Sequence, residues 1–363
     1  MKKMLTTLMV LAFALAATSA MAGDMAWSFY GKLHTSVNTI NDSENSALGL
    51  SSNTSRIGFK GNQELNENFT FIWQIEGAVN MAQKDNNWGA NRNSFLGLKG
   101  TWGTALWGIH DTPYKTLGRK TTYFFDSIGD NRQIMMHVDD RNDDYIMYFS
   151  PDFSGFNFQL GYEFDQNAAG SDNAATSFAG MASYTKNAFY VGFAYEALSK
   201  GMFDYVDDMD TTDPMDDVYV NGENGETRMR FAGRYDAEKF GIALSYQMLT
   251  DYEGVKDWKS TTFGGELMFH ASEKVDLKGG YYMIDPNTEE LGGGTDQGAN
   301  LVAIGIDYNY VKNVQFYLQY AGMMNQDNGD FGLGDYNAFG APTDVYMTGE
   351  TVSGISFGSV IKF

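Results

Sequence analysis

Alternating apolar and polar positions recur along the chain and predict β-strands. The clearest run covers residues 240–248, where every second side chain is large and apolar and those between are small or polar. Its apolar set is Phe240, Ile242, Leu244, Tyr246 and Met248. Residues 189–196 and 314–320 follow the same two-residue period. Because side chains of a strand point alternately to opposite faces, each run predicts a strand with one apolar and one polar face.

About sixteen segments carry this pattern or a weaker form of it. They lie near residues 26–40, 53–62, 68–81, 91–100, 103–109, 141–150, 155–164, 176–185, 188–198, 227–236, 239–250, 259–271, 275–285, 299–311, 313–324 and 350–363. Tight turns such as 186–187 alternate with long links such as 110–140 and 199–226. Transmembrane β-barrels show this alternation. A secreted two-sheet sandwich would share the strand pattern with its apolar faces turned inward, so that alternative stays open.

The last predicted strand runs to the final residue. Its large apolar side chains Ile355, Phe357, Ile361 and Phe363 fall on one face. An unpaired terminal strand would expose backbone donors and acceptors. We therefore expect this strand to pair with the first one and to close a barrel.

The composition agrees with many aromatic-rich strands and frequent turns. The chain has 41 Gly, 22 Tyr and 26 Phe but 5 Pro. After the first residues, no apolar run approaches the roughly 20 residues that a spanning helix needs. The mean hydropathy of −0.34 suits a barrel, because only alternate residues face lipid. We predict an all-β protein in which residues 23–363 form a single transmembrane antiparallel β-barrel.

The first residues predict an export signal. Lys2 and Lys3 precede a largely apolar stretch, residues 5–17, and Ala20-Met-Ala22 is a small-x-small cleavage site. We therefore expect residues 1–22 to be a signal peptide that is removed before Gly23, so that the mature protein leaves the cytoplasm.

The chain is strongly acidic. Its formal net charge of −21 becomes −23 when Lys2 and Lys3 leave with the signal. This charge argues against nucleic acid as a partner and favours cations. Nine carboxylates and no Lys or Arg lie in residues 201–226, which we interpret as a solvated outer loop. A functional interpretation is that these carboxylates bind Ca²⁺ or Mg²⁺, or bridge through them to lipopolysaccharide phosphates.

Motifs of enzymes are missing from the sequence. The chain has no cysteine, and its four histidines, at positions 34, 110, 137 and 270, show no metal-binding spacing. No Gly-x-Ser-x-Gly elbow or phosphate-binding Gly-Lys-Ser/Thr loop occurs. We predict that the protein is not an enzyme and needs no cofactor.

Four segments resemble the general porins of Gram-negative outer membranes, which are trimeric sixteen-strand barrels. The segments are 30–33, 55–61 (Ser-Arg-Ile-Gly-Phe-Lys-Gly), 91–98 and 141–155, which contains Tyr-Phe-Ser-Pro-Asp-Phe-Ser-Gly. The second half of the chain resembles these porins mainly in the spacing of its predicted strands and turns and in its terminal Phe363. The resemblance implies a homotrimer in the bacterial outer membrane, in contact with lipid and lipopolysaccharide.

The resemblance also implies that the long loop after strand five, residues 110–140, folds into the barrel and narrows it. Its acidic residues would face a wall of basic residues across a narrow aqueous gap. The implied pore constriction consists of Lys32, Arg56, Arg92 and Arg141 on the wall and Asp126 and Asp130 on the loop. Opposed charges of this kind create a transverse field that orients water and dipolar solutes.

We therefore predict a porin for passive diffusion of ions and small hydrophilic solutes, with a preference for cations drawn from the net charge. Two alternatives stay open. A solute-specific channel would use the aromatic run Tyr123, Phe124 and Phe125 as a slide for its solute. A structural barrel that tethers an outer layer through its acidic loops would be nearly non-conducting.

Overall fold

The computed structural model describes residues 26–42, 44, 46–84, 88–165, 174–203, 205–207, 218–220, 224–287, 296–333, 338–339 and 348–363. The predicted signal peptide, residues 1–22, lies outside the described residues. Most of the acidic segment 201–226, with the ion sites predicted for it, lies outside them as well.

Sixteen long strands in the described part of the chain pair antiparallel in chain order. They are β1 (Ala26–Asn41), β3 (Arg56–Asn66), β4 (Phe69–Val79), β6 (Ser94–Gly100), β7 (Gly103–Asp111), β8 (Arg141–Phe149), β9 (Phe156–Glu163), β10 (Ser177–Lys186), β11 (Phe189–Leu198), β14 (Glu226–Asp236), β15 (Phe240–Thr250), β16 (Lys259–His270), β17 (Val275–Asn287), β18 (Ala299–Val311), β19 (Val314–Asn325) and β21 (Thr351–Lys362). Each coincides with a predicted strand to within a few residues.

Shorter elements occupy the links. The main sheet also includes β2 (Ser46–Asn53), β5 (Trp88–Asn91) and β20 (Ala338–Phe339), while β12 (Tyr205–Asp207) pairs with β13 (Val218–Val220). The helical elements are α2 (Pro113–Lys120), η1 (Asn131–Gln133), η2 (Lys200–Phe203) and η3 (Tyr252–Gly254). Among the described residues, no helix is both long and apolar enough to cross a membrane.

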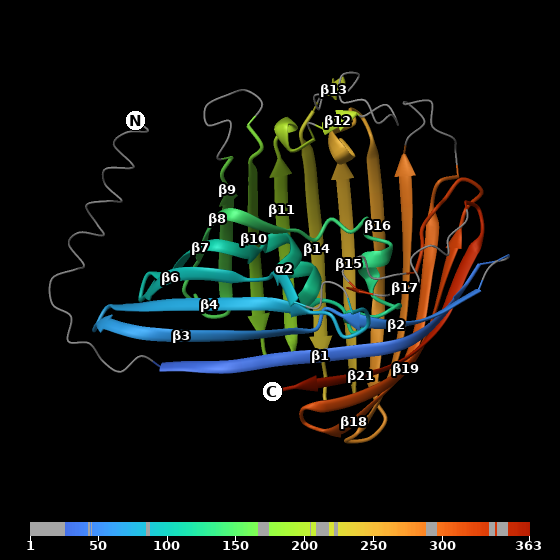
Figure 1. Cartoon of the computed structure of the whole chain (residues 1–363), viewed down its shortest axis with the longest axis horizontal. Coiled ribbons are helices and arrows are strands. Elements are labelled where there is room, and N and C mark those ends of the chain that lie inside the picture. Colours follow the sequence, from blue (N-terminus) through green and yellow to red (C-terminus); the bar gives the residue numbers. More distant parts are fainter. Residues whose placement is uncertain are drawn as a thin grey trace.

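The first and last strands close the barrel. β1 pairs with β21 from Lys32 opposite Lys362 to Asn41 opposite Ser353. The backbone N–H of Gly31 donates to the Phe363 carbonyl at 2.9 Å, and the Phe363 N–H donates back at 3.1 Å. Figure 1 shows β1 (blue) and β21 (dark red) running beside each other at the lower front of the barrel. The predicted closed β-barrel is confirmed, and the two-sheet sandwich is excluded.

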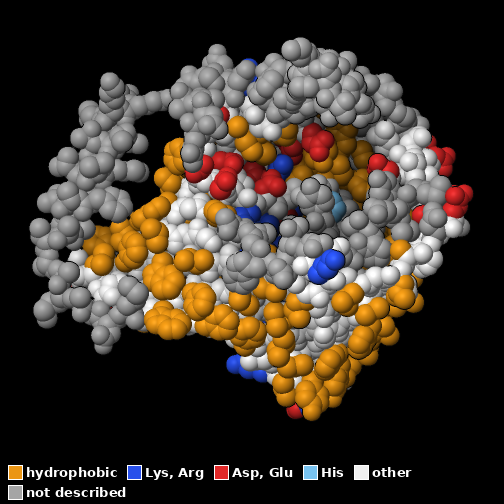
Figure 2. Space-filling model, viewed as in Figure 1, with side chains coloured by type: hydrophobic (Ala, Val, Ile, Leu, Met, Phe, Trp, Pro, Cys, Tyr) orange, Lys and Arg blue, Asp and Glu red, His pale blue; other side chains and the backbone are white. Residues whose placement is uncertain are grey.

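The apolar strand faces point outward. Ile355, Phe357 and Ile361 are 53%, 56% and 42% exposed, whereas Ser245 and Gln247, at polar positions of their strand, are buried inside. Figure 2 shows apolar side chains (orange) covering much of the outer surface, with charged side chains in the hollow of the molecule. A surface of this kind suits contact with lipid rather than water.

The strands β15, β17, β18 and β19 also direct apolar side chains inward. Buried residues on these strands include Leu249, Ile284, Leu301 and Met323. They pack against apolar side chains of the segment between β7 and β8, such as Phe124. The alternation predicts polar inner faces that contact water. Part of the inner surface is instead apolar and buried, because a folded segment of the chain covers it.

The turn between β8 and β9 depends on Gly155. Its φ of +97° lies where L side chains are strained, and a Cβ there would lie 2.2 Å from the Thr185 carbonyl oxygen. We expect Gly155→Ala to lower the free energy of unfolding by about 1–3 kcal/mol, measured from the thermal midpoint of the folded barrel in detergent. Gly279→Ala is the matched control, since a Cβ there meets nothing within 4 Å. Equal midpoints for the two variants would contradict this assignment.

Candidate functional site

Residues 112–140, which we call the inner loop, connect β7 to β8 and pack against the inner face of the barrel. The loop begins with α2, whose first turn is capped by Thr112: its side chain accepts a hydrogen bond from the Lys115 N–H. Pro113 at the first helical position favours the same start. The buried Leu117 of α2 then packs with Ala194 and Ala232 of the wall. The cap and this apolar contact fix the entry of the loop into the barrel.

A buried ion pair anchors the far end of the inner loop. Arg230 of β14 donates to Asp139 at 2.6 Å and to Gln247 at 2.6 Å. Its guanidinium carbon also lies 4.2 Å from the ring centroid of Tyr114, which is a cation–π contact. Arg230 therefore ties together the two ends of the inner loop and the barrel wall.

Arg228 of the same strand forms a second anchor. It donates to Glu196 at 3.0 Å, to Glu226 at 2.5 Å and to the Val138 carbonyl at 3.0 Å, and it also pairs with Asp140. Glu226 was expected in the solvated acidic loop, but it is buried in this cluster. The expectation fails for this residue because a neighbouring inward-facing arginine compensates its charge.

Glu266 of β16 holds the middle of the inner loop. Its carboxylate accepts from the Thr122 hydroxyl at 2.9 Å, from the Tyr282 hydroxyl at 3.0 Å and from the Tyr123 backbone N–H. The loop is thus attached by polar contacts at its middle to β16 and at its end to β14, and these two strands both flank β15.

The two predicted acids lie in an ion cluster at the tip of the inner loop. Asp126 accepts from Lys32 at 2.7 Å, from Arg119 at 2.7 Å and from Arg132 at 3.1 Å. Asp130 accepts from the same two arginines at 2.9 and 3.2 Å. The structure brings together Lys32 and the two acids, but cations of the loop itself surround both carboxylates.

These cations keep the two carboxyl groups at the tip of the inner loop deprotonated. Burial raises the pKa of the Asp126 carboxyl, but Lys32, Arg119 and Arg132 outweigh it and hold the pKa well below its ordinary value. The pKa of Asp130 is lowered in the same way, by Arg132 and Arg119 acting against burial. Both carboxylates are therefore ionised throughout the neutral pH range.

The other three predicted wall residues pair with acids that the sequence analysis did not select. Arg92 donates to Glu76 at 2.7 Å, with Arg56 3.6 Å from the same carboxylate, and Arg141 lies 2.8 Å from Asp111. Glu76 lies inside a strand that otherwise faces lipid on alternate positions. This position in the sequence could have identified Glu76 as a residue of the pore, because a carboxylate inside a barrel strand must face the lumen or an interface.

Two cavities meet at the tip of the inner loop. The first, of about 220 Å³, opens among strand ends that carry long links, and we call it the loop-side cavity. The second, of about 330 Å³, opens among strand ends joined by tight turns, and we call it the turn-side cavity. Arg56 and Phe125 line both. These two residues therefore stand where the cavities adjoin.

Cations outnumber carboxylates around the loop-side cavity. Its basic lining residues are Arg56, Arg92, Lys115, Arg119, Arg132 and Arg141, against the acids Asp111 and Asp126. The side chains of Arg56 and Arg92 are more exposed than that of their shared partner Glu76, whereas Arg141 is 17% exposed beside Asp111 at 23%. An ion in this cavity meets mainly positive charge.

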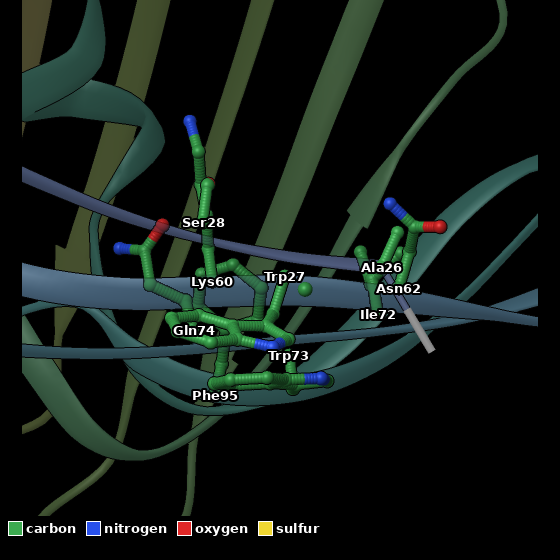
Figure 3. Close-up of a pocket in the computed structure, with 10 residues that line it drawn as sticks. Ala26, Trp27, Ser28, Lys60, Asn62, Ile72, Trp73, Gln74 and Phe95 are labelled. Carbon is green, nitrogen blue, oxygen red and sulfur yellow. The ribbon is translucent and has the colours of Figure 1, made fainter. Parts of the chain in front are cut away.

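A third cavity, of about 370 Å³, is lined by residues of β1, β3 and β4 and by Phe95 of β6. Figure 3 shows Lys60 and Gln74 reaching to the same side of these strands. The cavity contains none of the predicted constriction residues.

The sequence profile described as "Gram-negative porin" matches residues 6–328, which is most of the chain. The chain belongs to this family. The major outer membrane protein P.IB of Neisseria sicca is 27% identical over 321 residues, which cover 81% of this chain and 84% of that protein. This porin is accordingly a protein of the Gram-negative outer membrane and a member of a channel family rather than an enzyme.

Solved structures share the barrel of this porin. An anion-selective porin from Comamonas acidovorans superposes with a TM-score of 0.74 at 19% identity, over 94% of this chain and all of that one. The trimer form of OmpT, an outer membrane protein of Vibrio cholerae, gives 0.65 at 18% identity, over 94% of this chain and all of that one. At these identities the likeness supports the fold alone.

Proposed function

We propose that this porin forms a water-filled channel through which ions and small hydrophilic solutes diffuse passively, and that the inner loop narrows it. The observation that carries the proposal is the pair of charge-lined cavities that adjoin at Phe125 and Arg56 inside a closed barrel. A polar route of this kind is unnecessary for a barrel that only tethers an outer layer. The aromatic slide of a solute-specific channel gains less support, because Phe124 is fully buried.

We further propose that the constriction favours anions. The acids of the tip are buried in ion pairs, so the exposed charges at the loop-side cavity are mainly guanidinium groups. Charges at the narrowest part of a channel act on an ion more strongly than distant ones do. The cation preference expected from the net charge, −21 for the full chain and −23 without Lys2 and Lys3, stays a prediction of the opposite sign.

A planar-bilayer recording with the purified protein under a KCl gradient tests both proposals. Stepwise conductance supports a channel, and its reversal potential gives the sign of the selectivity. An anion-side potential supports control by the constriction, and a cation-side potential supports control by the net charge. A bilayer without conductance steps would defeat the channel and favour the tethering barrel.

Neutralising the basic wall should change the selectivity. We expect the triple variant Arg56→Gln, Arg92→Gln and Arg141→Gln to move the reversal potential toward the cation side and to raise the single-channel conductance. The cause is the loss of positive potential together with three long side chains. Lys60→Gln is a control at the third cavity. If the triple variant keeps the wild-type conductance and selectivity, these arginines do not form the constriction.

We also propose that the protein is a homotrimer embedded in lipid and lipopolysaccharide. The trimer form of a structurally similar outer membrane protein supports the assembly. Chemical cross-linking in native outer membranes tests it, with a ladder that ends at three subunits as the expected result.

A further inference from the structure

Phe125 is an exposed apolar ring between two cavities that are lined mainly by charged and polar side chains. Its side chain is 41% exposed, although its neighbours Tyr123 and Phe124 are 7% and 0% exposed. An apolar ring that is exposed to water lacks the stabilisation that burial would give it. A ligand that covered the ring would supply that stabilisation.

The backbone holds this ring in one place. Asp126, the next residue, has a φ of +54°, a left-handed conformation that aspartate tolerates better than most side chains do. The ion pairs of Asp126 with Lys32, Arg119 and Arg132 keep it there. Phe125 is therefore presented by a fixed turn rather than by a free loop.

The guanidinium of Arg119 covers one part of the ring, with its carbon 3.5 Å from the ring centroid. Arg119 is itself bonded to Asp126 and Asp130, so it supports the ring from within the loop. The exposed remainder of the ring lines both cavities. Phe125 thus offers an anchored apolar surface at the point where the cavities adjoin.

Arg56 supplies a cation at the same place. It is the other residue common to both cavities, and at 27% its side chain is more exposed than those of Lys32, Arg92 and Arg141 at 11%, 15% and 17%. Its Nη1 donates to the Thr54 carbonyl at 3.2 Å, while its Nε lies 3.6 Å from Glu76, beyond hydrogen-bond distance. An anionic group can therefore compete for this guanidinium, which favours the two-point geometry of a carboxylate.

We propose that Phe125 and Arg56 form a binding site for planar aromatic carboxylates on their way through the pore. The carboxylate pairs with Arg56 while the flat ring of the solute stacks on Phe125. A saturated carboxylate of equal charge meets the same arginine but loses the stacking contact. The inference rests on the proposed channel function and gives that channel a solute class.

The test compares benzoate with cyclohexanecarboxylate as blockers of the KCl current through the full-length porin in planar bilayers. Benzoate should half-block at a concentration about 3- to 10-fold lower, which is the range expected for one aromatic contact. Phe125→Leu should bring the two concentrations together. Arg56→Gln should weaken both blockers alike. Phe153→Leu, at an exposed phenylalanine of the β8–β9 turn, is the matched control and should keep the benzoate preference.

Equal half-blocking concentrations in the wild type would overturn the site, and so would a benzoate preference that survives Phe125→Leu. These results leave the KCl steps in place and therefore leave the channel function standing. A wild-type protein without KCl steps would instead overturn the proposed channel and the site with it.

Discussion

Replacing Arg230 by Met is expected to lower the free energy of unfolding by about 3–5 kcal/mol, because the change leaves a buried carboxylate without its counter-charge. Arg230 is 1% exposed, and the side chain of its partner Asp139 is 4% exposed. Methionine preserves much of the volume of the side chain but supplies no hydrogen-bond donor for Asp139 or Gln247. The substitution removes the contact that holds the end of the inner loop. The loop should then move more, so the open-channel current should also become noisier.

The thermal midpoint of the folded barrel in detergent and the single-channel record measure these two effects. The double variant Arg230→Met with Asp139→Asn provides the control, because it removes the orphaned charge together with its partner. We expect it to regain a large part of the lost stability. If both variants melt at the same temperature, the buried charge is not the cause. A quiet wild-type current in Arg230→Met would show that the loop is held by its other anchors.

The barrel itself follows from local sequence. A two-residue period is visible within a single strand, as in Phe240 to Met248, and the alternation of tight and long links needs no knowledge of distant contacts. The closure follows from one further argument, that an unpaired final strand is unstable. The strands β5, β12, β13 and β20 were not predicted, because runs of two to four residues are too short to show a period. The eight-residue strand β2 was missed because most of its residues are small and it has few of the large apolar side chains that mark the other strands.

The contacts of the inner loop could not be predicted in the same way. Arg230 and Asp139 are 91 positions apart, and Arg228 and Asp140 are 88 apart. No local pattern joins such residues, and a charged residue at an inward strand position has many conceivable partners. The inward apolar residues Leu301 and Met323 did leave a signal, since each lies beside a second apolar residue and so interrupts the alternation.

The family resemblance predicted some of the contacts of the acids at the loop tip but not all of them. It selected Asp126 and Asp130, and Asp126 does contact the predicted wall residue Lys32. The sequence could not assign the remaining contacts, because the loop carries Arg119 and Arg132 beside its carboxylates. Which charges pair within the loop, and which remain for the pore, depends on the fold of α2 and η1.

Asp126→Asn should disrupt the tip and strengthen the anion preference. The change leaves Lys32, Arg119 and Arg132 around a neutral side chain, with Asp130 as the carboxylate that stays in contact with both arginines. We expect a loss of about 3 kcal/mol in the free energy of unfolding, as for other broken buried pairs. The thermal midpoint and the reversal potential under a KCl gradient measure the two effects. Asp285→Asn, at an exposed aspartate of β17, is the matched control.

The pH dependence of the wild type gives an independent check on the same cluster. A carboxyl whose pKa is lowered by folding adds stability above its ordinary pKa, and that stability is lost as the pH falls through the lowered value. The pKa of Asp126 lies well below the ordinary 3.8. The Asp126 ion pairs should therefore persist when the pH is lowered from 7 to about 4.5. The difference in thermal midpoint between wild type and Asp126→Asn should stay constant over that range. A difference that vanishes near pH 5 would show that Asp126 titrates there, and that Lys32, Arg119 and Arg132 do not hold its charge.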